Sequence, residues 1–334
     1  MQDAILIISP ADDVHALALA AVLDRDFGTP AIIWDCGTLP LESQIDFRLD
    51  ESVSEIRFKG PAGSHRLTDF HSIWWRRPAS FRIDKSVTDA KVRRFCEAEC
   101  EAFFKGVVKS LAVPIINNPF AESVAARKPY QLTMARKVGL DIPKTLMSNN
   151  PASIRAFWSE LDGRCIYKSF LSPSWTFTET RELRKADLEH LESLRHAPLI
   201  VQEKIEKGRD VRVNVFGEAV FAVAVTTHIP EADLDWRIDQ TGEWHQHDLP
   251  DATARKLVDL LQAMGLEMGC IDLRQQPDRT YRFLEVNPAG QFLFAEIDTG
   301  QPLLRALAEL LVRPREAQKS GRFPLPRNST FARC

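Results

Sequence analysis

Alternating strand and helix patterns in the first third of the chain restrict its fold more than any other feature. Short apolar runs at 4–8, 31–35 and 72–75 have the composition of buried strands. Residues 13–26 and 88–111 instead repeat apolar side chains at helical spacing. Strands that alternate with helices predict an open, mainly parallel α/β sheet. The side chains of the second helix that we expect to face the core are Val92, Phe95, Cys96, Phe103 and Val107.

Composition is that of a globular protein without an obvious charged or lipid partner. The length of 334 residues is enough for two or three domains. Of these residues, 44% are hydrophobic and 27% are charged, which is ordinary for a globular protein. The formal net charge is −3, so we expect no nucleic acid and no membrane surface as a partner. The first apolar run has no basic flank, which argues against a signal peptide. Six cysteines without a Cys-x-x-Cys pair indicate reduced thiols and a cytoplasmic location.

The rest of the chain contains further strand and helix patterns. A stretch rich in Pro and Asn at 113–120 marks a boundary, and a helix pattern at 121–139 then ends at Gly139. Gly217-Glu218 predicts a tight hairpin inside the apolar stretch 211–226. Further strands are expected at 164–170, 198–205, 269–274 and 281–287. Further helices are expected after Asn150 and Pro151 and at 181–195, 251–264 and 301–312.

Two strands near the C-terminus carry polar side chains that an ordinary buried strand would not favour. In RFLEVNPAGQF, Glu285 and Asn287 are two residues apart and therefore point to the same face. Asp272 in CIDL can join them if the two strands pair as a hairpin. Uncompensated carboxylates there would cost several kcal/mol each, and a cation bound by oxygen ligands, such as Mg²⁺, removes that cost. The alternative is surface carboxylates paired with Arg274 and Arg282.

Two lysines and one polar segment have the chemistry of a nucleotide site. Lys128 begins a helix, and Lys168 lies in the strand CIYKSF, where its amine either extends to solvent or meets an anion. The segment IVQEKIEKGRDVRV combines a strand end, a polar break and a second strand. Backbone groups at such a strand end can bind an adenine edge. Glu203 and Asp210 can bind ribose hydroxyls, and Arg212 can bind a phosphate oxygen.

The ordered set of these motifs resembles the ATP-grasp superfamily of carboxylate–amine ligases. Within it the resemblance is closer to one branch, the maturases of microviridin-type peptides, also called graspetides. These enzymes join Asp or Glu side chains of a precursor peptide to Ser, Thr or Lys side chains. The similarity extends to about residue 312. The motifs that carry it are IWWRRP (73–78), KPYQLTMARKVGLDIPKTLMSN (128–149), DLDWRID (233–239) and GCIDLRQQPDRTYRFLEVNPAGQFLFAEIDTGQPLLRALAELL (269–311).

The resemblance implies an ATP-grasp fold that combines α/β and α+β parts. A Rossmann-like N-terminal domain would precede two lobes that grip ATP. Placed on this chain, the N-terminal pre-ATP-grasp domain would be 1–115 and the central lobe 116–203. The C-terminal lobe with the metal site would be 204–312, followed by a tail at 313–334.

The resemblance also implies roles for individual residues. Those expected to bind ATP are Lys128, Lys168, Gln202, Glu203, Ile205 and Asp210. Those expected to act in catalysis are Arg212, Arg237 and Asp272. Those expected to bind one or two Mg²⁺ ions are Asp272, Glu285 and Asn287.

The implied activity is ATP-dependent ligation that forms ADP and phosphate. Transfer of the γ-phosphoryl group to a carboxylate gives an acyl phosphate, which a Ser or Thr hydroxyl or a Lys amine then attacks. The expected cofactors are ATP and Mg²⁺. The expected partner is a ribosomal precursor peptide with leader and core, closed by macrocyclic ester or amide links, and a homodimer is compatible with the resemblance. The alternatives are a ligase of free amino acids or small molecules, of the glutathione-synthetase or ribosomal-modification type, and a non-catalytic nucleotide-binding regulator.

Two further features have structural interpretations. Trp74 and Trp75 are expected in a core strand and in inter-domain packing, with substrate contact as the alternative. His245 and His247 have a spacing that suits a metal, but no third ligand accompanies them. We therefore expect these histidines to be structural or exposed.

Overall fold

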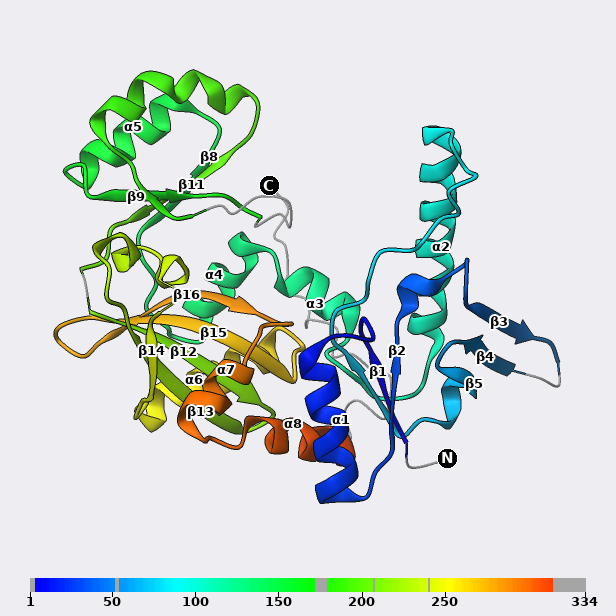
Figure 1. Ribbon diagram of the computed structural model, residues 1–334. Coiled ribbons are helices and arrows are strands. Elements are labelled where there is room, and N and C mark those ends of the chain that lie inside the picture. The colour runs from blue at the N-terminus through cyan, green and yellow to red at the C-terminus, as the bar shows by residue number, and fades with distance from the viewer. Residues whose placement is uncertain (1–3, 52–53, 172–178, 207, 240, 315–334) are drawn as a thin grey trace. The chain divides into compact units, whose positions relative to one another are not determined.

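The protein divides into two compact units, seen in the computed structural model (Figure 1). The structure describes residues 4–51, 54–171, 179–206, 208–239 and 241–314. Unit 1 comprises residues 1–122, 265–267 and 302–334, and unit 2 comprises residues 123–264 and 268–301. Within the described ranges, no helix combines the length and the apolar character that crossing a membrane requires. The predicted three-part division at 115, 203 and 312 stays a prediction.

A parallel four-stranded sheet is the centre of unit 1 (Figure 1). Its strand order is β2 (Ala31–Trp34), β1 (Ile5–Ile8), β6 (Ser72–Trp75) and β7 (Ile115–Ile116). All four side chains of β1 are buried, as expected for a parallel strand covered on both faces. Helix α1 (Val14–Phe27) packs against α8 (Leu303–Val312), so the last helix belongs to unit 1. The predicted α/β character of the first third is confirmed.

Helix α2 (Ala90–Ser110) turns a different face to the core than the sequence predicts. Of the five residues expected to face inward, Val107 is buried and Cys96 is half-buried, but Val92, Phe95 and Phe103 are 49%, 64% and 44% exposed. The buried face instead contains Phe104, Val107 and Val108. The prediction was wrong because apolar residues occupy two adjacent arcs of this helix, and only packing decides which arc is covered.

A small antiparallel sheet in unit 1 was not predicted. It consists of β3 (Gln44–Leu49), β4 (Ser54–Gly60) and β5 (Gly63–Arg66). Apolar and charged residues alternate along β3 and β4, a pattern typical of half-buried strands, but neither strand contains a continuous apolar run. Ile56 and Phe58 nevertheless face the core, and the Phe58 ring stacks on Trp34 with 4.3 Å between centroids.

The first sheet of unit 2 is antiparallel and has four strands. Their order is β10 (Arg181–Glu182), β9 (Cys165–Lys168), β11 (Leu199–Glu203) and β8 (Thr145–Ser148). Helix α5 (Pro151–Glu160) begins as predicted, with Pro151 in its first turn and the Asn150 side chain accepting from the Ala152 N–H. The charged segment expected to be a helix forms 3₁₀ turns, η3 (Lys185–Arg195).

The second sheet of unit 2 has five antiparallel strands. Their order is β14 (Glu243–Gln246), β13 (Ala219–Thr226), β12 (Arg209–Phe216), β15 (Met268–Gln275) and β16 (Tyr281–Asn287). The predicted hairpin between β12 and β13 is confirmed, and Gly217 at its turn has φ +61°. Helices α6 (Asp251–Ala263) and α7 (Leu293–Thr299) belong to the same unit.

The single helix predicted at 121–139 is two helices. They are α3 (Pro119–Ala125) and α4 (Lys128–Lys137). Arg127 is extended, with φ −83° and ψ 111°, and Pro129 lies in the first turn of α4. Proline has no N–H and fits best in a first turn, so a new helix begins there. Gly139 follows α4 in the left-handed region with φ +77°.

Candidate ATP and metal site

The hairpin of β15 and β16 brings the predicted carboxylates together. Asp272 lies opposite Glu285, and Cys270 lies opposite Asn287. Directly opposed residues share a face of the sheet, so the two carboxylates point the same way. A register shift after Asp272 pairs Leu273 with Phe283 and marks a bulge at this point. The predicted pairing of these strands is confirmed.

Asn287 is exposed at the end of β16. Its Oδ1 accepts a hydrogen bond from the N–H of Ala289 at 3.2 Å. A carbonyl oxygen has a second lone pair, so this bond leaves Oδ1 able to bind a cation.

Arg212 on β12 holds Asp272 from the other side. The two residues are opposed in the β12–β15 register, and Nη1 donates to both carboxylate oxygens at 2.8 Å. Burial works against the charged guanidinium, which is 7% exposed, yet the Asp272 carboxylate raises its pKa above the ordinary value. Burial raises the pKa of Asp272, the Arg212 charge lowers it, and the nearby Glu285 carboxylate raises it again, with a net increase. Asp272 is therefore a half-buried carboxylate that Arg212 holds through both of its oxygens.

The two predicted phosphate-binding lysines, Lys128 and Lys168, lie near Glu285. Lys128, the first residue of α4, donates from its ammonium group to Glu285 Oε2. Burial alone would raise the pKa of Glu285, but the charges of Lys128 and Lys168 lower it to about 2. Burial lowers the pKa of Lys168, and the Glu285 charge opposes that effect. Over the described ranges Lys168 forms no ion pair, so its ammonium is held near Glu285 without a direct contact.

Arg237 lies in the short 3₁₀ helix η5 (Trp236–Ile238) and is oriented by Asp235. Its Nε and Nη2 donate to the two Asp235 oxygens at 2.7 and 2.5 Å. This hydrogen bonding raises the pKa of Arg237, burial lowers it, and the charges of Asp235, Glu285 and Asp272 raise it further. Arg237 is 40% exposed, which leaves part of its guanidinium accessible.

The predicted adenine-binding residues lie at the end of β11. The Gln202 side chain is buried, and its Nε2 donates to Thr145 Oγ1 at 2.8 Å. Glu203 accepts from the backbone N–H of Lys144 at 3.2 Å through Oε2. Ile205 is half-buried just after the strand. Their roles toward adenine stay predictions.

Asp210, predicted to face ribose, is engaged by Arg274. The Arg274 side chain donates to both Asp210 oxygens at 2.7 and 2.8 Å through Nη2 and to Oδ1 at 2.9 Å through Nε. Burial raises the pKa of Asp210, and Arg274 opposes this. The alternative in which Arg274 pairs with a hairpin carboxylate is wrong, since Arg274 binds Asp210 and Arg282 donates to Gln276.

Two residues of the site were missed by sequence reasoning. The motif DLDWRID predicts no role for Asp235, but its carboxylate orients Arg237. Gly290 allows the backbone after β16 to approach β15, because a Cβ there would lie 2.5 Å from Cys270 Cβ and 3.0 Å from Arg212 Nη2. The signal for the glycine was its position in the NPAG turn.

The charges of this cluster suit a metal-bound polyphosphate. Four cationic side chains, those of Lys128, Lys168, Arg212 and Arg237, surround the two carboxylates and leave an excess of positive charge. No group of three or more His, Cys, Asp or Glu able to hold a metal occurs in the part of the chain that the structure describes. Two carboxylates and one amide oxygen fit Mg²⁺, which takes its remaining ligands from phosphates and water.

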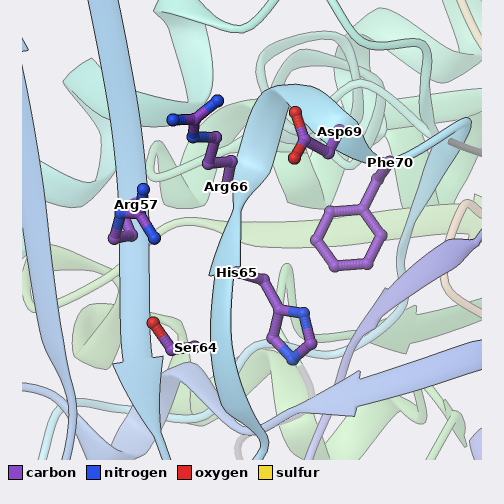
Figure 2. Close-up of a pocket in the computed structure, with 6 residues that line it drawn as sticks. All are labelled: Arg57, Ser64, His65, Arg66, Asp69 and Phe70. Carbon is purple, nitrogen blue, oxygen red and sulfur yellow. The ribbon is translucent and has the colours of Figure 1, made fainter. Parts of the chain in front are cut away.

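Unit 1 contains a pocket of its own. Its volume is about 270 Å³, and its lining residues are Arg57, Ser64, His65, Arg66, Asp69 and Phe70 (Figure 2). Arg57 and Arg66 oppose each other in the β4–β5 register, and both contact Glu55 Oε1. None of the residues predicted for ATP, metal or catalysis lines this pocket.

Comparison with known proteins gives a consistent result. Residues 4–122 match the model of the MvdD pre-ATP grasp domain. No curated protein sequence is significantly similar to the chain.

Several solved structures have the same fold. Macrocyclase MdnC of Microcystis aeruginosa MRC, bound to the precursor peptide MdnA, is 28% identical with a TM-score of 0.80, covering 92% of this chain and 99% of MdnC. The ATP-grasp ligase PsnB, with minimal precursor, Mg and ADP, is 26% identical with a TM-score of 0.78, covering 96% and 98%. A RiPP-associated ATP-grasp ligase of Chryseobacterium gregarium is 24% identical with a TM-score of 0.85, covering 94% and 98%, and supports the fold alone.

These similarities confirm the predicted fold and the predicted resemblance, whereas the roles of single residues stay predictions. ADP and Mg in the PsnB structure agree with the expected cofactors. The protein has the ATP-grasp fold and is an ATP-dependent ligase that resembles the macrocyclases of ribosomal peptides.

Proposed function

We propose that the protein closes ester or amide links within a ribosomal precursor peptide. It would convert an Asp or Glu side chain of the peptide to an acyl phosphate and couple it to a Ser or Thr hydroxyl or a Lys amine. The observation that carries this proposal is the Asp272–Glu285 pair enclosed by four cationic side chains. The peptide substrate is supported by the similarity to MdnC, whose structure contains its precursor peptide.

Positioning and charge neutralisation are what phosphoryl transfer requires of a protein. Lys128 and Lys168 would hold the phosphates of ATP, since both ammonium groups lie beside Glu285. Asp272, Glu285 and Asn287 would hold Mg²⁺. A metal ion held by these residues would supply positive charge for the transferred group.

The two arginines would have different tasks. Arg212 is buried against Asp272 and would keep that carboxylate in one orientation. Arg237 is fixed at one side by Asp235 but partly accessible, so it would contact the transferred phosphoryl group or the acceptor carboxylate. No protein nucleophile is needed, because the attacking hydroxyl or amine comes from the peptide.

Two broader expectations belong to the same proposal. The three-part division at 115, 203 and 312 follows the ATP-grasp plan. A cytoplasmic location is supported by the need for ATP and by the described cysteines that form no disulfide, which are Cys36, Cys96, Cys100, Cys165 and Cys270.

The experiment uses the full chain with ATP, Mg²⁺ and the small peptide encoded beside its gene. Each bond formed should lower the peptide mass by one water, and mild base should restore the mass where the bond is an ester. Omitting ATP is the control. An unchanged peptide, with ligation only between free amino acids, would move the assignment to the small-molecule ligases.

A further inference from the structure

The backbone between two predicted metal ligands is held by a side chain from another element. Val286 lies between Glu285 and Asn287 on β16, which is an edge strand of its sheet. The outer edge of such a strand presents N–H and C=O groups that no other strand pairs. Gln131 of α4 pairs both groups of Val286, since its Oε1 accepts from the N–H at 3.2 Å and its Nε2 donates to the C=O at 2.8 Å.

The Gln131 amide is buried, and both hydrogens of its Nε2 are used. Its Nε2 also donates to the carbonyl of Ala125 at the end of α3, at 2.8 Å. The residue is only 3% exposed, and a buried amide that lost these partners would carry the cost of unsatisfied polar groups. Gln131 therefore joins α3, α4 and β16 at one point.

Gln131 and Lys128 contact successive residues of β16. They are three residues apart on α4, which places them on one face of that helix. The Lys128 ammonium contacts the Glu285 side chain, and the Gln131 amide binds the Val286 backbone. The position of α4 along β16 is thus set by two neighbouring contacts. The Gln131 amide binds the Val286 backbone, and the Lys128 ammonium binds the Glu285 carboxylate.

We propose that Gln131 is a positioning residue for the metal site, which fixes β16 against α4 so that Glu285 and Asn287 keep their orientation. The inference rests on the proposed roles of Glu285 and Asn287 as metal ligands. Residues that orient metal ligands commonly change metal affinity or activity by 10–100-fold when altered. A second anchor remains on the outer edge of β16, because the Phe283 N–H donates to the Asp141 carbonyl at 2.7 Å. Loss of Gln131 should therefore loosen the strand locally without releasing it.

The test compares Gln131→Met with Leu132→Ala. The first keeps the length of the side chain and removes its three hydrogen bonds. The second removes buried apolar volume from the next residue of α4, whose side chain has no polar contact with β16. Hydrogen exchange of peptides covering 281–287, the Mg²⁺ concentration for half-maximal rate, and the rise in Tm caused by Mg·ADP are measured for both.

Gln131→Met should exchange faster at 281–287 and need roughly 10–100-fold more Mg²⁺, with a smaller Mg·ADP shift of Tm. Leu132→Ala should lower Tm and leave the Mg²⁺ requirement unchanged. Equal loss of Tm in both variants, with the Mg²⁺ requirement unchanged in Gln131→Met, would overturn the positioning role. Should Gln131→Met not fold, Gln131→Glu keeps the acceptor for the Val286 N–H, removes the amide donors, and takes its place in the same measurements.

Glu285→Ala separates this inference from the proposed function. A changed Mg²⁺ requirement in Glu285→Ala, together with an unchanged one in Gln131→Met, rejects only the positioning role. An unchanged requirement in Glu285→Ala rejects the metal assignment and the inference with it.

Discussion

Arg212 and Asp272 face each other on neighbouring strands, and one guanidinium nitrogen, Nη1, donates to both carboxylate oxygens at 2.8 Å. Asp272 also lies opposite Glu285 on the next strand. Arg212, Asp272 and Glu285 therefore form one row across three strands. The Lys128 ammonium contacts the last of them, Glu285. Cationic side chains therefore flank both half-buried carboxylates at the place where we propose that Mg²⁺ and the phosphates of ATP bind, and the charges of Lys128 and Lys168 lower the pKa of Glu285 to about 2.

Removal of the Glu285 carboxylate should abolish most ligation and leave the fold intact. Glu285→Ala is expected to lower the ligation rate by roughly 10²–10³ at saturating Mg²⁺, because single groups that neutralise developing charge contribute about this much. The rate is followed by ADP release and peptide mass. Glu160→Ala, which removes an exposed carboxylate of unit 2, is the control. Full activity of Glu285→Ala would contradict the metal assignment.

Replacement of Lys128 or Lys168 by Met should weaken nucleotide binding. Each substitution keeps the side-chain length and removes a positive charge beside Glu285. Added ATP should then raise Tm less than it does in the unaltered protein, since stabilisation by a ligand grows with the logarithm of its concentration divided by Kd. Lys144→Met, at an exposed lysine of the same unit, should keep the full shift. An undiminished shift in both site variants would show that the lysines are structural.

Loss of Arg212 should destabilise unit 2. Arg212→Met removes the cation that is hydrogen-bonded to the half-buried Asp272 carboxylate, and loss of one partner of a buried pair typically costs about 3–5 kcal/mol. The free energy of unfolding, measured with urea, should fall accordingly. Arg181→Met removes an exposed arginine whose ion pair with Glu179 is expected to contribute less than about 1 kcal/mol. Similar losses in the two variants would mean that the Arg212–Asp272 pair contributes no more than a surface contact.

A close backbone approach at Gly290 should not tolerate a methyl group. Gly290→Ala would place Cβ 2.5 Å from Cys270 Cβ and 3.0 Å from Arg212 Nη2, so β15 or Arg212 must move. We expect a loss of about 1–3 kcal/mol in stability, as for other overpacked positions, and reduced ligation. Gly106→Ala on α2 meets nothing within 4 Å and should be neutral or stabilising. Urea unfolding of both variants checks the difference.

Stability of unit 1 should depend on the ionisation of Glu122. Burial raises the pKa of Glu122 from 4.5 to about 7, although the charges of Arg76 and Arg77 oppose this. The folded state therefore favours the protonated carboxyl. The stability that protonation contributes is fully present below pH 4.5 and is lost as the pH rises toward 7.

Glu122→Gln removes this titration. The variant should match the unaltered protein at low pH and exceed its unfolding free energy by roughly 1–3 kcal/mol above pH 7. Urea unfolding across pH 4.5–8 measures the difference. If the difference in unfolding free energy between Glu122→Gln and the unaltered protein stayed constant from pH 4.5 to 8, the raised pKa of Glu122 would be contradicted.

Features that depend on local periodicity and turn chemistry could be predicted from the sequence. Alternation along 281–287 was enough to put Glu285 and Asn287 on one face, and the short turn after Gln275 was enough to bring Asp272 opposite. The cap at Asn150 and the left-handed Gly217 could be predicted for the same reason, since each depends on neighbours a few residues away.

The partners of the charged side chains could not be predicted, because they depend on how distant elements pack together. Arg212 lies on β12 and Arg274 on the neighbouring β15. The register between the two strands places Arg212 opposite Asp272 and Arg274 opposite Asp210. Lys128 meets Glu285 across 157 residues, and Gln131 meets Val286 across 155. Periodicity encodes the direction of a side chain within its own element, whereas a partner depends on which elements pack together. The uncovered arc of α2, with Phe95 in solvent, has the same cause.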